Sequence, residues 1–180
     1  MLLREKVIVV SGVGPGLGRS IAVQSARAGA TVVLAARTES RLEEVSKEIA
    51  EIAEIGGRTC VVPTDIDSDA SAAKLAETVL ETFGRVDALV NNAFAMPPMA
   101  DLAEADLEAV AAGFHTNVVS ALRLTRLFAP ALADSRGSVV MINRKPLPGR
   151  ELRTTTCDYR PPLEFEQAFR EGPSQQPAAA

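Results

Sequence analysis

Short apolar runs alternate with longer amphipathic segments along the chain as far as residue 143. The first run, Val7 to Val10, is apolar at every position, which is typical of a strand buried on both faces. Similar runs predict further strands at 31–35, 60–62, 86–90 and 138–143. The segments between them have helical periodicity and predict helices at 19–28, from 38 or 40 to 52, at 68–83, at 101–112 and at 114–132.

This alternation predicts the fold class. In the second helix Leu42, Val45 and Ile49 share one face and the opposite face is charged, so the helix is expected to cover a sheet with one side only. Strands joined through helices lie parallel, with right-handed crossovers. The sequence therefore predicts an α/β fold, namely a Rossmann-like doubly wound parallel sheet with helices on both faces.

The composition changes after Asn143. Residues 144–180 contain no valine, isoleucine or methionine, yet they hold six of the eleven prolines and five arginines. The pair Pro161-Pro162 forbids a long helix through that point. We therefore divide the chain into a domain at 1–143 and an arginine- and proline-rich tail at 144–180, which we expect to be poorly ordered.

Charge and composition exclude several classes of protein. The net charge of −4, without a cluster of basic residues, argues against nucleic-acid binding. The apolar run near the start is too short for a signal sequence or a membrane span, which favours a cytoplasmic protein. Two separated cysteines and one histidine offer neither a metal site nor a Ser-His-Asp triad.

A glycine-rich segment lies between the first strand and the first helix. It reads Ser11-Gly12-Val13-Gly14-Pro15-Gly16-Leu17-Gly18. Glycines allow a tight turn and a close approach of the backbone to a pyrophosphate, and the following helix directs its free N–H groups at phosphates. This position predicts a dinucleotide site, although glycines that only relieve crowding in a loop would give the same letters.

Further residues then agree with a known family in order and spacing. The pattern Gly12-x-x-x-Gly16-x-Gly18 resembles the TGxxxGxG fingerprint of the short-chain dehydrogenase/reductase family, and Asn91-Asn92-Ala93 resembles three residues of its NNAG motif. Phe94 stands where the family has glycine, and it is expected either to narrow the cofactor cleft or to face the substrate side. The resemblance covers residues 6–143 and implies a nicotinamide dinucleotide as cofactor.

The resemblance also implies roles for individual residues. The cofactor-binding residues it implies are Gly12, Gly14, Gly16, Leu17, Gly18, Asp65, Ile66, Asn91 and Ala93. Among them, Asp65 and Ile66 are expected at the adenine ring, and Asn91 is expected to stabilise the sheet and line the cleft. Asn117 matches the helix asparagine that supports the family's proton relay.

The end of the second strand bears on cofactor choice. Members that prefer NAD have a carboxylate there, which accepts hydrogen bonds from the ribose hydroxyls. This chain has Arg37 beside that position, and a guanidinium can pair with a phosphate. We expect NADP(H) to be favoured over NAD(H), unless Arg37 is simply a solvated residue at the start of a helix.

The family's catalytic residues are missing at the expected positions. Arg144 occupies the place of the serine, and Leu163 stands four residues after Tyr159, where Tyr-x-x-x-Lys requires lysine. The sheet is therefore expected to be incomplete at its C-terminal side, and the chain to be truncated and inactive. Residues 144–180 are interpreted as an out-of-frame or substituted end, and an evolved pseudoenzyme is the alternative.

Three functions are compatible with these observations. The first is an NADP(H)-dependent alcohol/carbonyl oxidoreductase by family, with a small-molecule substrate. The second is a non-catalytic dinucleotide-binding module, and the third is a methyltransferase, which the Asn91 and Asn117 matches disfavour. A homo-oligomer is typical of the family, but its interface is expected to be incomplete here.

Overall fold

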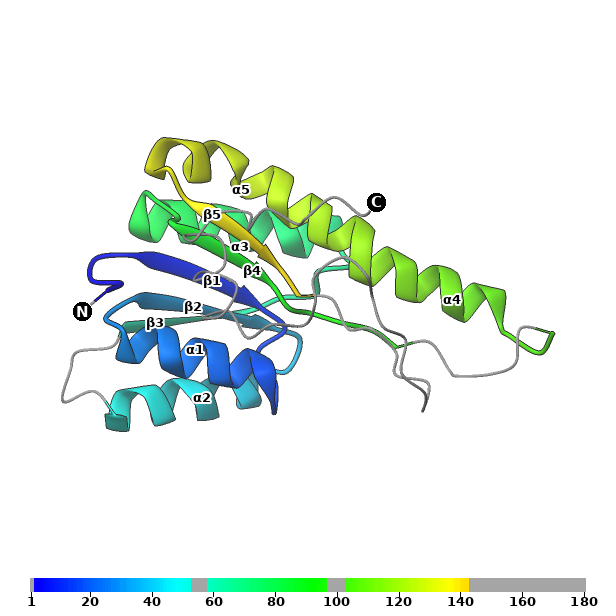
Figure 1. The fold of residues 1–180 in the computed structure, drawn as a ribbon, viewed down its shortest axis with the longest axis horizontal. Coiled ribbons are helices and arrows are strands. Elements are labelled where there is room, and N and C mark those ends of the chain that lie inside the picture. Colours follow the sequence, from blue (N-terminus) through cyan, green and yellow to red (C-terminus); the bar gives the residue numbers. More distant parts are fainter. Residues whose placement is uncertain (1, 53–57, 97–102, 143–180) are drawn as a thin grey trace, which may run out of the picture. The chain divides into compact units, whose positions relative to one another are not determined.

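Five parallel strands in the order β3-β2-β1-β4-β5 form the centre of the computed structural model (Figure 1). The structure describes residues 2–52, 58–96 and 103–142. The strands are β1 Val7–Ser11, β2 Thr31–Ala36, β3 Arg58–Pro63, β4 Ala88–Asn91 and β5 Ser138–Met141. The predicted α/β parallel sheet is confirmed. The tail at 144–180 lies outside the described residues.

The helices cover both faces of this sheet, as Figure 1 shows. They are α1 Leu17–Arg27, α2 Glu39–Ile52, α3 Asp69–Phe83, α4 Leu107–Phe114 and α5 Ala121–Ser135. On one face, Val10 and Val32 pack in a core with Leu42 of α2. On the other face, Val9 packs in a second core with Phe128 of α5. Burial on both faces explains why β1 and β2 are continuous apolar runs.

The strand order reverses next to β1. The chain runs outward from β1 through β2 to β3, then returns so that β4 pairs with the other side of β1. Ser11 at the end of β1 is therefore paired with Ala35 on one side and with Asn91 on the other. The carboxyl ends of strands at such a reversal are where ligands bind in open α/β sheets.

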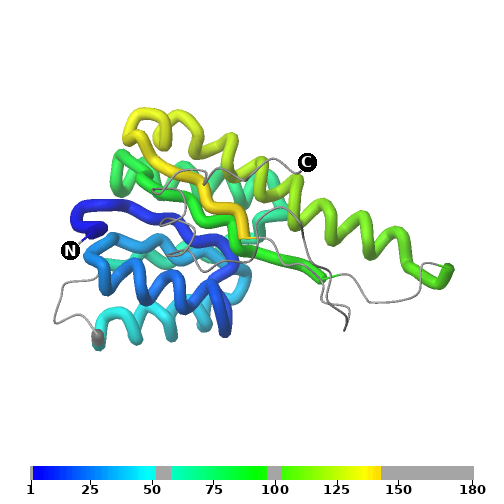
Figure 2. Tube along the Cα trace, viewed as in Figure 1, coloured from blue at the N-terminus to red at the C-terminus, as the bar shows by residue number. Residues whose placement is uncertain are grey.

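One predicted helix begins later than expected. The prediction started at 101, whereas α4 starts at Leu107, because Oδ1 of Asp106 caps the helix by accepting from the N–H groups of Glu108 and Ala109. The sequence also predicted a separate helix from residue 114, and the structure differs there too. A π-helical segment, η1 His115–Ser120, joins α4 to α5, and the three run on as one rod (Figure 2).

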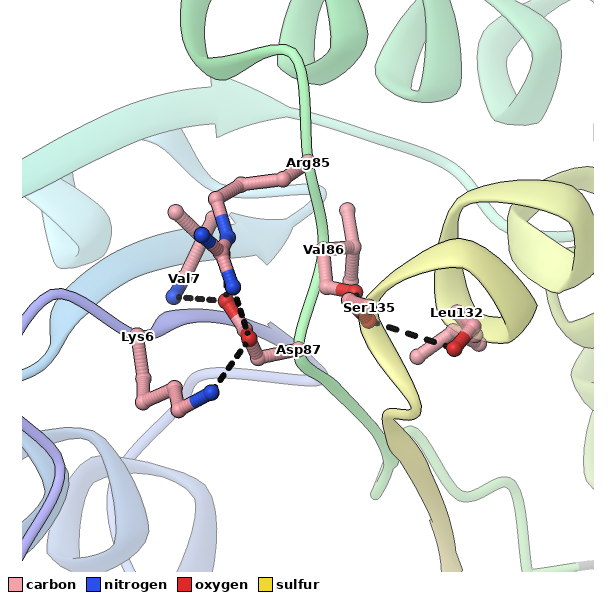
Figure 3. A network of polar contacts seen from close by, with 7 residues as sticks. All are labelled: Lys6, Val7, Arg85, Val86, Asp87, Leu132 and Ser135. Carbon is pink, nitrogen blue, oxygen red and sulfur yellow. Dashed lines mark hydrogen bonds and ion pairs between the residues drawn. The ribbon is translucent and has the colours of Figure 1, made fainter.

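At the amino ends of β1 and β4, a buried carboxylate holds the two strands together (Figure 3). Asp87 accepts hydrogen bonds from Lys6 Nζ (2.9 Å), Arg85 Nη2 (2.6 Å) and the N–H of Val7 (3.0 Å). Burial alone would raise the pKa of Asp87, but these donors and the Arg85 charge outweigh it and lower the pKa to about 2. β4 begins at Ala88, two residues later than the start at residue 86 that the sequence predicted.

The last strand of the described sheet is an edge strand. All residues of β5 are exposed, including Val139 and Val140 at 40% and 43%.

Among the described helices, none has both the length and the apolar composition needed to cross a membrane.

Candidate functional site

A cavity of about 800 Å³ opens at the carboxyl ends of the strands, where the strand order reverses. Its walls come from the glycine-rich loop, the ends of β2 and β3, the segment after β4, and η1. The lining residues are Gly12, Val13, Gly14, Pro15, Leu17, Gly18, Ala36, Arg37, Thr38, Arg41, Thr64, Asp65, Ile66, Asp67, Asn92, Ala93, Phe94, Ala95, Thr116 and Ile142. Of the site residues predicted from sequence, all but Gly16, Asn91 and Asn117 line this cavity.

The loop after β1 requires glycine at two positions because of close contacts. Gly12 has φ +73°, and a Cβ there would lie 2.5 Å from Cα of Ala93. A Cβ at Gly18 would meet the carbonyl oxygen of Gly12 and, at 2.7 Å, Nδ2 of Asn92. Gly12 and Gly18 are therefore needed because β1, β4 and α1 approach one another too closely there for a side chain.

Two other glycines of the loop, Gly14 and Gly16, have open space beside them. A Cβ at Gly14 or Gly16 would have no atom within 4 Å, and Gly16 has φ +113°. Gly16 is also the N-cap residue of α1, and no side chain caps that helix end. The first N–H groups of α1 thus have no side-chain acceptor at the cavity, an arrangement that suits an anion.

Asn92 ties the glycine-rich loop to the end of β4. Its Nδ2 donates to the carbonyl oxygens of Gly12 (2.9 Å) and Ser11 (3.3 Å), while its N–H donates to Ser11 Oγ (3.2 Å). Asn92 belongs to the NNAG-like motif, and the motif alone assigned no role to it. Its contacts show that it shapes the cavity wall.

Asn91 differs from its expected place. Its side chain is buried, donates to Thr125 Oγ1 (3.0 Å) and Met141 Sδ (3.2 Å), and does not line the cavity. As the last residue of β4 it is directed at the α5 side of the sheet, and its expected contact with a cofactor stays a prediction. Its Oδ1 is buried without a hydrogen-bond partner among the described residues.

Asn117 lies on η1 and holds the loop that follows β4. Its Oδ1 accepts from the N–H of Ala95 and its Nδ2 donates to the carbonyl oxygen of Ala95, both at 2.8 Å. Both polar groups of the amide are therefore used for positioning that loop. Next to it, Phe94 lines the cavity with its side chain 43% exposed, so a ring stands on the wall where the family has glycine.

Two arginines face the cavity at the end of β2. Arg37, predicted from sequence, precedes α2, and Arg41 lies four residues later in the first turn of that helix. Neither forms an ion pair with another residue in the described part of the chain, whereas Arg19 is held by Glu48 at 2.6 Å. The sequence analysis did not select Arg41, which the structure adds to the cavity wall.

Asp65 and Ile66, in the loop after β3, belong to a part of the cavity lining that we call the far wall. Their expected place at an adenine ring stays a prediction. Asp65 is exposed and Ile66 is buried, which gives a carboxylate beside an apolar surface. Asp67 and Thr116, which the sequence analysis did not select, complete this wall.

Several residues from the sequence analysis take no part in this cavity or lie outside the described residues. Cys60 is half-buried beside the core, where burial raises the pKa of its thiol. Arg144, Tyr159 and Leu163 lie outside the described part of the chain. Residues 2–52, 58–96 and 103–142 contain no group of three or more His, Cys, Asp or Glu side chains that could hold a metal ion.

Similarity to known proteins agrees with this geometry. The model of the short-chain dehydrogenase family matches residues 6–145. 11-beta-hydroxysteroid dehydrogenase A of Sesamum indicum is 33% identical over 138 residues, covering 77% of this chain and 39% of that protein. 7alpha-hydroxysteroid dehydrogenase of Escherichia coli K12 is 32% identical over 146 residues, covering 77% of this chain and 52% of that protein.

A solved structure gives the same result. A metagenomic short-chain oxidoreductase in complex with NADP superposes with a TM-score of 0.71 at 34% identity, covering 77% of this chain and 62% of that chain. The chain thus spans about half the length of the curated relatives named above. The family model, the relatives and the fold agree over the same residues: this chain belongs to the short-chain dehydrogenase/reductase family.

Proposed function

We propose that this chain binds NADP(H) in the cavity and does not catalyse hydride transfer by itself. Its family interconverts alcohols and carbonyl compounds, and the dinucleotide supplies the hydride when it is bound. The residues proposed to hold the cofactor are Gly12, Gly14, Gly16, Leu17, Gly18, Arg37, Arg41, Asp65, Ile66 and Ala93.

The glycine-rich wall is suited to a pyrophosphate. The open space at Gly14 and Gly16 admits a ligand close to the backbone, and the uncapped start of α1 offers N–H donors. The volume of about 800 Å³ lies within the range of ordinary cofactor sites, about 300–1,000 Å³.

The observation that carries the preference for NADP(H) is the pair Arg37 and Arg41. Both guanidinium groups border the cavity at the end of β2, where a carboxylate would accept the ribose hydroxyls of NAD. Neither is neutralised by an acidic partner among the described residues. A 2′-phosphate would supply that partner.

The absence of catalysis is proposed from residue types. Arg144 and Leu163 replace the serine and lysine of the relay, and Tyr159 precedes Pro161-Pro162. Loss of a general acid alone lowers a rate by about 10²–10⁴-fold. Asn117 is the remaining relay residue, and its amide is already bonded to Ala95. The alternative is an oxidoreductase whose relay is supplied by other groups.

Titration with NADPH and NADH, followed by cofactor fluorescence, tests this proposal. We expect saturable NADPH binding, weaker NADH binding, and no oxidation of NADPH with model ketones. Turnover would support the oxidoreductase alternative, and failure of both cofactors to bind would overturn the proposal.

We also propose that two copies associate through the outer face of α4, η1 and α5. Val110, Phe114 and Leu122 are 43%, 60% and 57% exposed there. They recur every four residues together with the half-buried Val118. In a pure α-helix, side chains four residues apart shift steadily around the helix axis. The π-helical turn at 115–120 has more residues per turn and offsets this shift, so the four side chains stay in one straight row.

The charges along this row suit a second copy that lies antiparallel. Asp106 stands four residues before Val110, and Arg126 stands four residues after Leu122. A two-fold axis near Thr116 would place each Asp106 opposite the partner copy's position 126 and each Val110 opposite position 122. This self-complementary pattern is what an isologous interface requires.

A further inference from the structure

Asp67 connects the far wall of the cavity to the long helical rod. It lies in the loop between β3 and α3, and its carboxylate accepts two hydrogen bonds from η1. Thr116 Oγ1 donates to Oδ2 and Ser120 Oγ donates to Oδ1, both at 2.7 Å. Ser120 is fully buried whereas Asp67 is exposed, so the bond between them lies at the boundary between the packed interior and the surface.

The backbone N–H of Asp67 bonds toward Asp65 and not toward η1. Its N–H donates to Oδ1 of Asp65 at 3.1 Å. An unbroken series of contacts therefore runs from Thr116 and Ser120 through Asp67 to the carboxylate of Asp65, which borders the cavity.

Arg123 of α5 strengthens the same connection. Its Nη1 donates to the carbonyl oxygen of Ile66 (2.9 Å) and to Ser120 Oγ (3.2 Å), and its Nε pairs with Asp69 (2.5 Å). The loop that carries Asp65 and Ile66 is thus bonded to the helical rod at its backbone and at two acidic side chains. The guanidinium also compensates charge beside Asp65 and Asp67 of the loop and Asp69 at the start of α3.

We propose that Asp67 is a positioning residue for the adenine end of the dinucleotide, acting through Thr116 and Ser120. It fixes the place of Asp65 and Ile66 on the cavity wall. This inference rests on the proposed function, because it presupposes that a dinucleotide occupies the cavity. A loop that is already held in place loses less freedom when the ligand binds, so removal of the connection weakens affinity.

The Thr116→Val variant tests this proposal, because it removes one hydroxyl with little change in shape. The ligands are NADPH and adenosine 2′,5′-bisphosphate, which is the adenine half alone, with Kd measured by calorimetry. Thr116→Ser, which retains the hydroxyl, is the rescue variant. Thr82→Val is the matched control. Like Thr116 Oγ1, Thr82 Oγ1 donates to the carbonyl oxygen four residues earlier (2.7 Å for Thr82), but Thr82 lies on α3 and does not line the cavity.

We expect Thr116→Val to raise the Kd of both ligands by the same factor, about fivefold to tenfold. Thr116→Ser and Thr82→Val should remain within about twofold of the original Kd. Ser120→Ala, as a second removal, should weaken both ligands in the same way.

Unchanged affinity for adenosine 2′,5′-bisphosphate in both Thr116→Val and Ser120→Ala would overturn the positioning role while leaving the proposed function intact. A loss seen only with NADPH would also overturn it, because the effect would then lie at the nicotinamide end. Failure of the unmodified chain to bind either ligand would instead reject the proposed function and this inference with it.

Discussion

Asn117 pairs with both backbone polar groups of Ala95, accepting from its N–H and donating to its carbonyl oxygen at 2.8 Å each. The pair joins η1 to the loop after β4 across 22 residues of sequence. It holds the part of the cavity wall that carries Ala93 and Phe94.

Replacement of Asn117 by alanine should loosen that loop. Both backbone groups of Ala95 would lose their partner, so we expect the free energy of unfolding to fall by about 1–2 kcal/mol. Amide exchange at Ala95 should accelerate, which NMR would detect. Asn117→Asp keeps the acceptor but loses the donor, and it should show an intermediate effect. Equal exchange in all three chains would contradict this role.

Gly12→Ala should be strongly destabilising. The new Cβ would lie 2.5 Å from Cα of Ala93, at a residue with φ +73°. We expect a loss of more than about 2 kcal/mol in urea unfolding. Gly14→Ala is the matched control: its Cβ would meet no atom within 4 Å, so its stability should change by less than about 0.5 kcal/mol. Similar effects of the two substitutions would argue against the contact with β4.

Asp87 should make stability depend on acidic pH. Its folded-state pKa of about 2 lies below its ordinary value of 3.8, so its stabilisation is complete above the ordinary value and is lost as the pH falls through about 2. Lys6 and Arg85 are 44% and 46% exposed, which limits the contribution to about 1–2 kcal/mol.

The Asp87→Asn variant checks this pH dependence. Its unfolding free energy should be lower at pH 7 and should change less between pH 4 and pH 2 than that of the unmodified chain. Asp134→Asn, at an exposed residue of α5, should retain the original pH profile. If Asp87→Asn loses stability between pH 4 and pH 2 as steeply as the unmodified chain, other carboxylates cause the loss of stability in acid.

Removal of both cavity arginines should weaken the proposed preference for NADPH over NADH. In Arg37→Ala/Arg41→Ala we expect the Kd for NADPH to rise about tenfold to hundredfold, while the Kd for NADH changes by less than about threefold. Arg58→Ala, at the other end of β3, is the control for charge alone. Equal losses of affinity for NADPH and NADH would reject a contact between these arginines and the 2′-phosphate.

Disruption of the apolar row should change the oligomeric state. Phe114→Glu introduces a charge at a residue that is 60% exposed, and it should shift the chain from dimer to monomer in light scattering. Leu2→Glu, at a residue that is 95% exposed elsewhere, should leave the dimer intact. An unmodified chain that is monomeric at all concentrations would refute the interface.

Local sequence determined the elements and the type of fold. The apolar runs at β1 and β2 were visible because strands buried on both faces have no polar positions. The glycine-rich loop was visible because close contacts and positive φ exclude side chains at Gly12. The departure from a Tyr-x-x-x-Lys pattern was also visible, because Leu163 stands four residues after Tyr159.

The tertiary structure decided which side chains meet, since those contacts join segments that are distant in sequence. Asn91 and Asn92 are neighbours, yet only Asn92 lines the cavity: Asn91 ends β4 and bonds to Thr125 of α5, whereas Asn92 follows the strand and bonds to the glycine-rich loop. The contact of Asp67 with Thr116 spans 49 residues and depends on the crossover that brings η1 beside the end of β3. Periodicity also missed η1, because apolar spacing does not distinguish a π turn from an α turn when both continue one buried face.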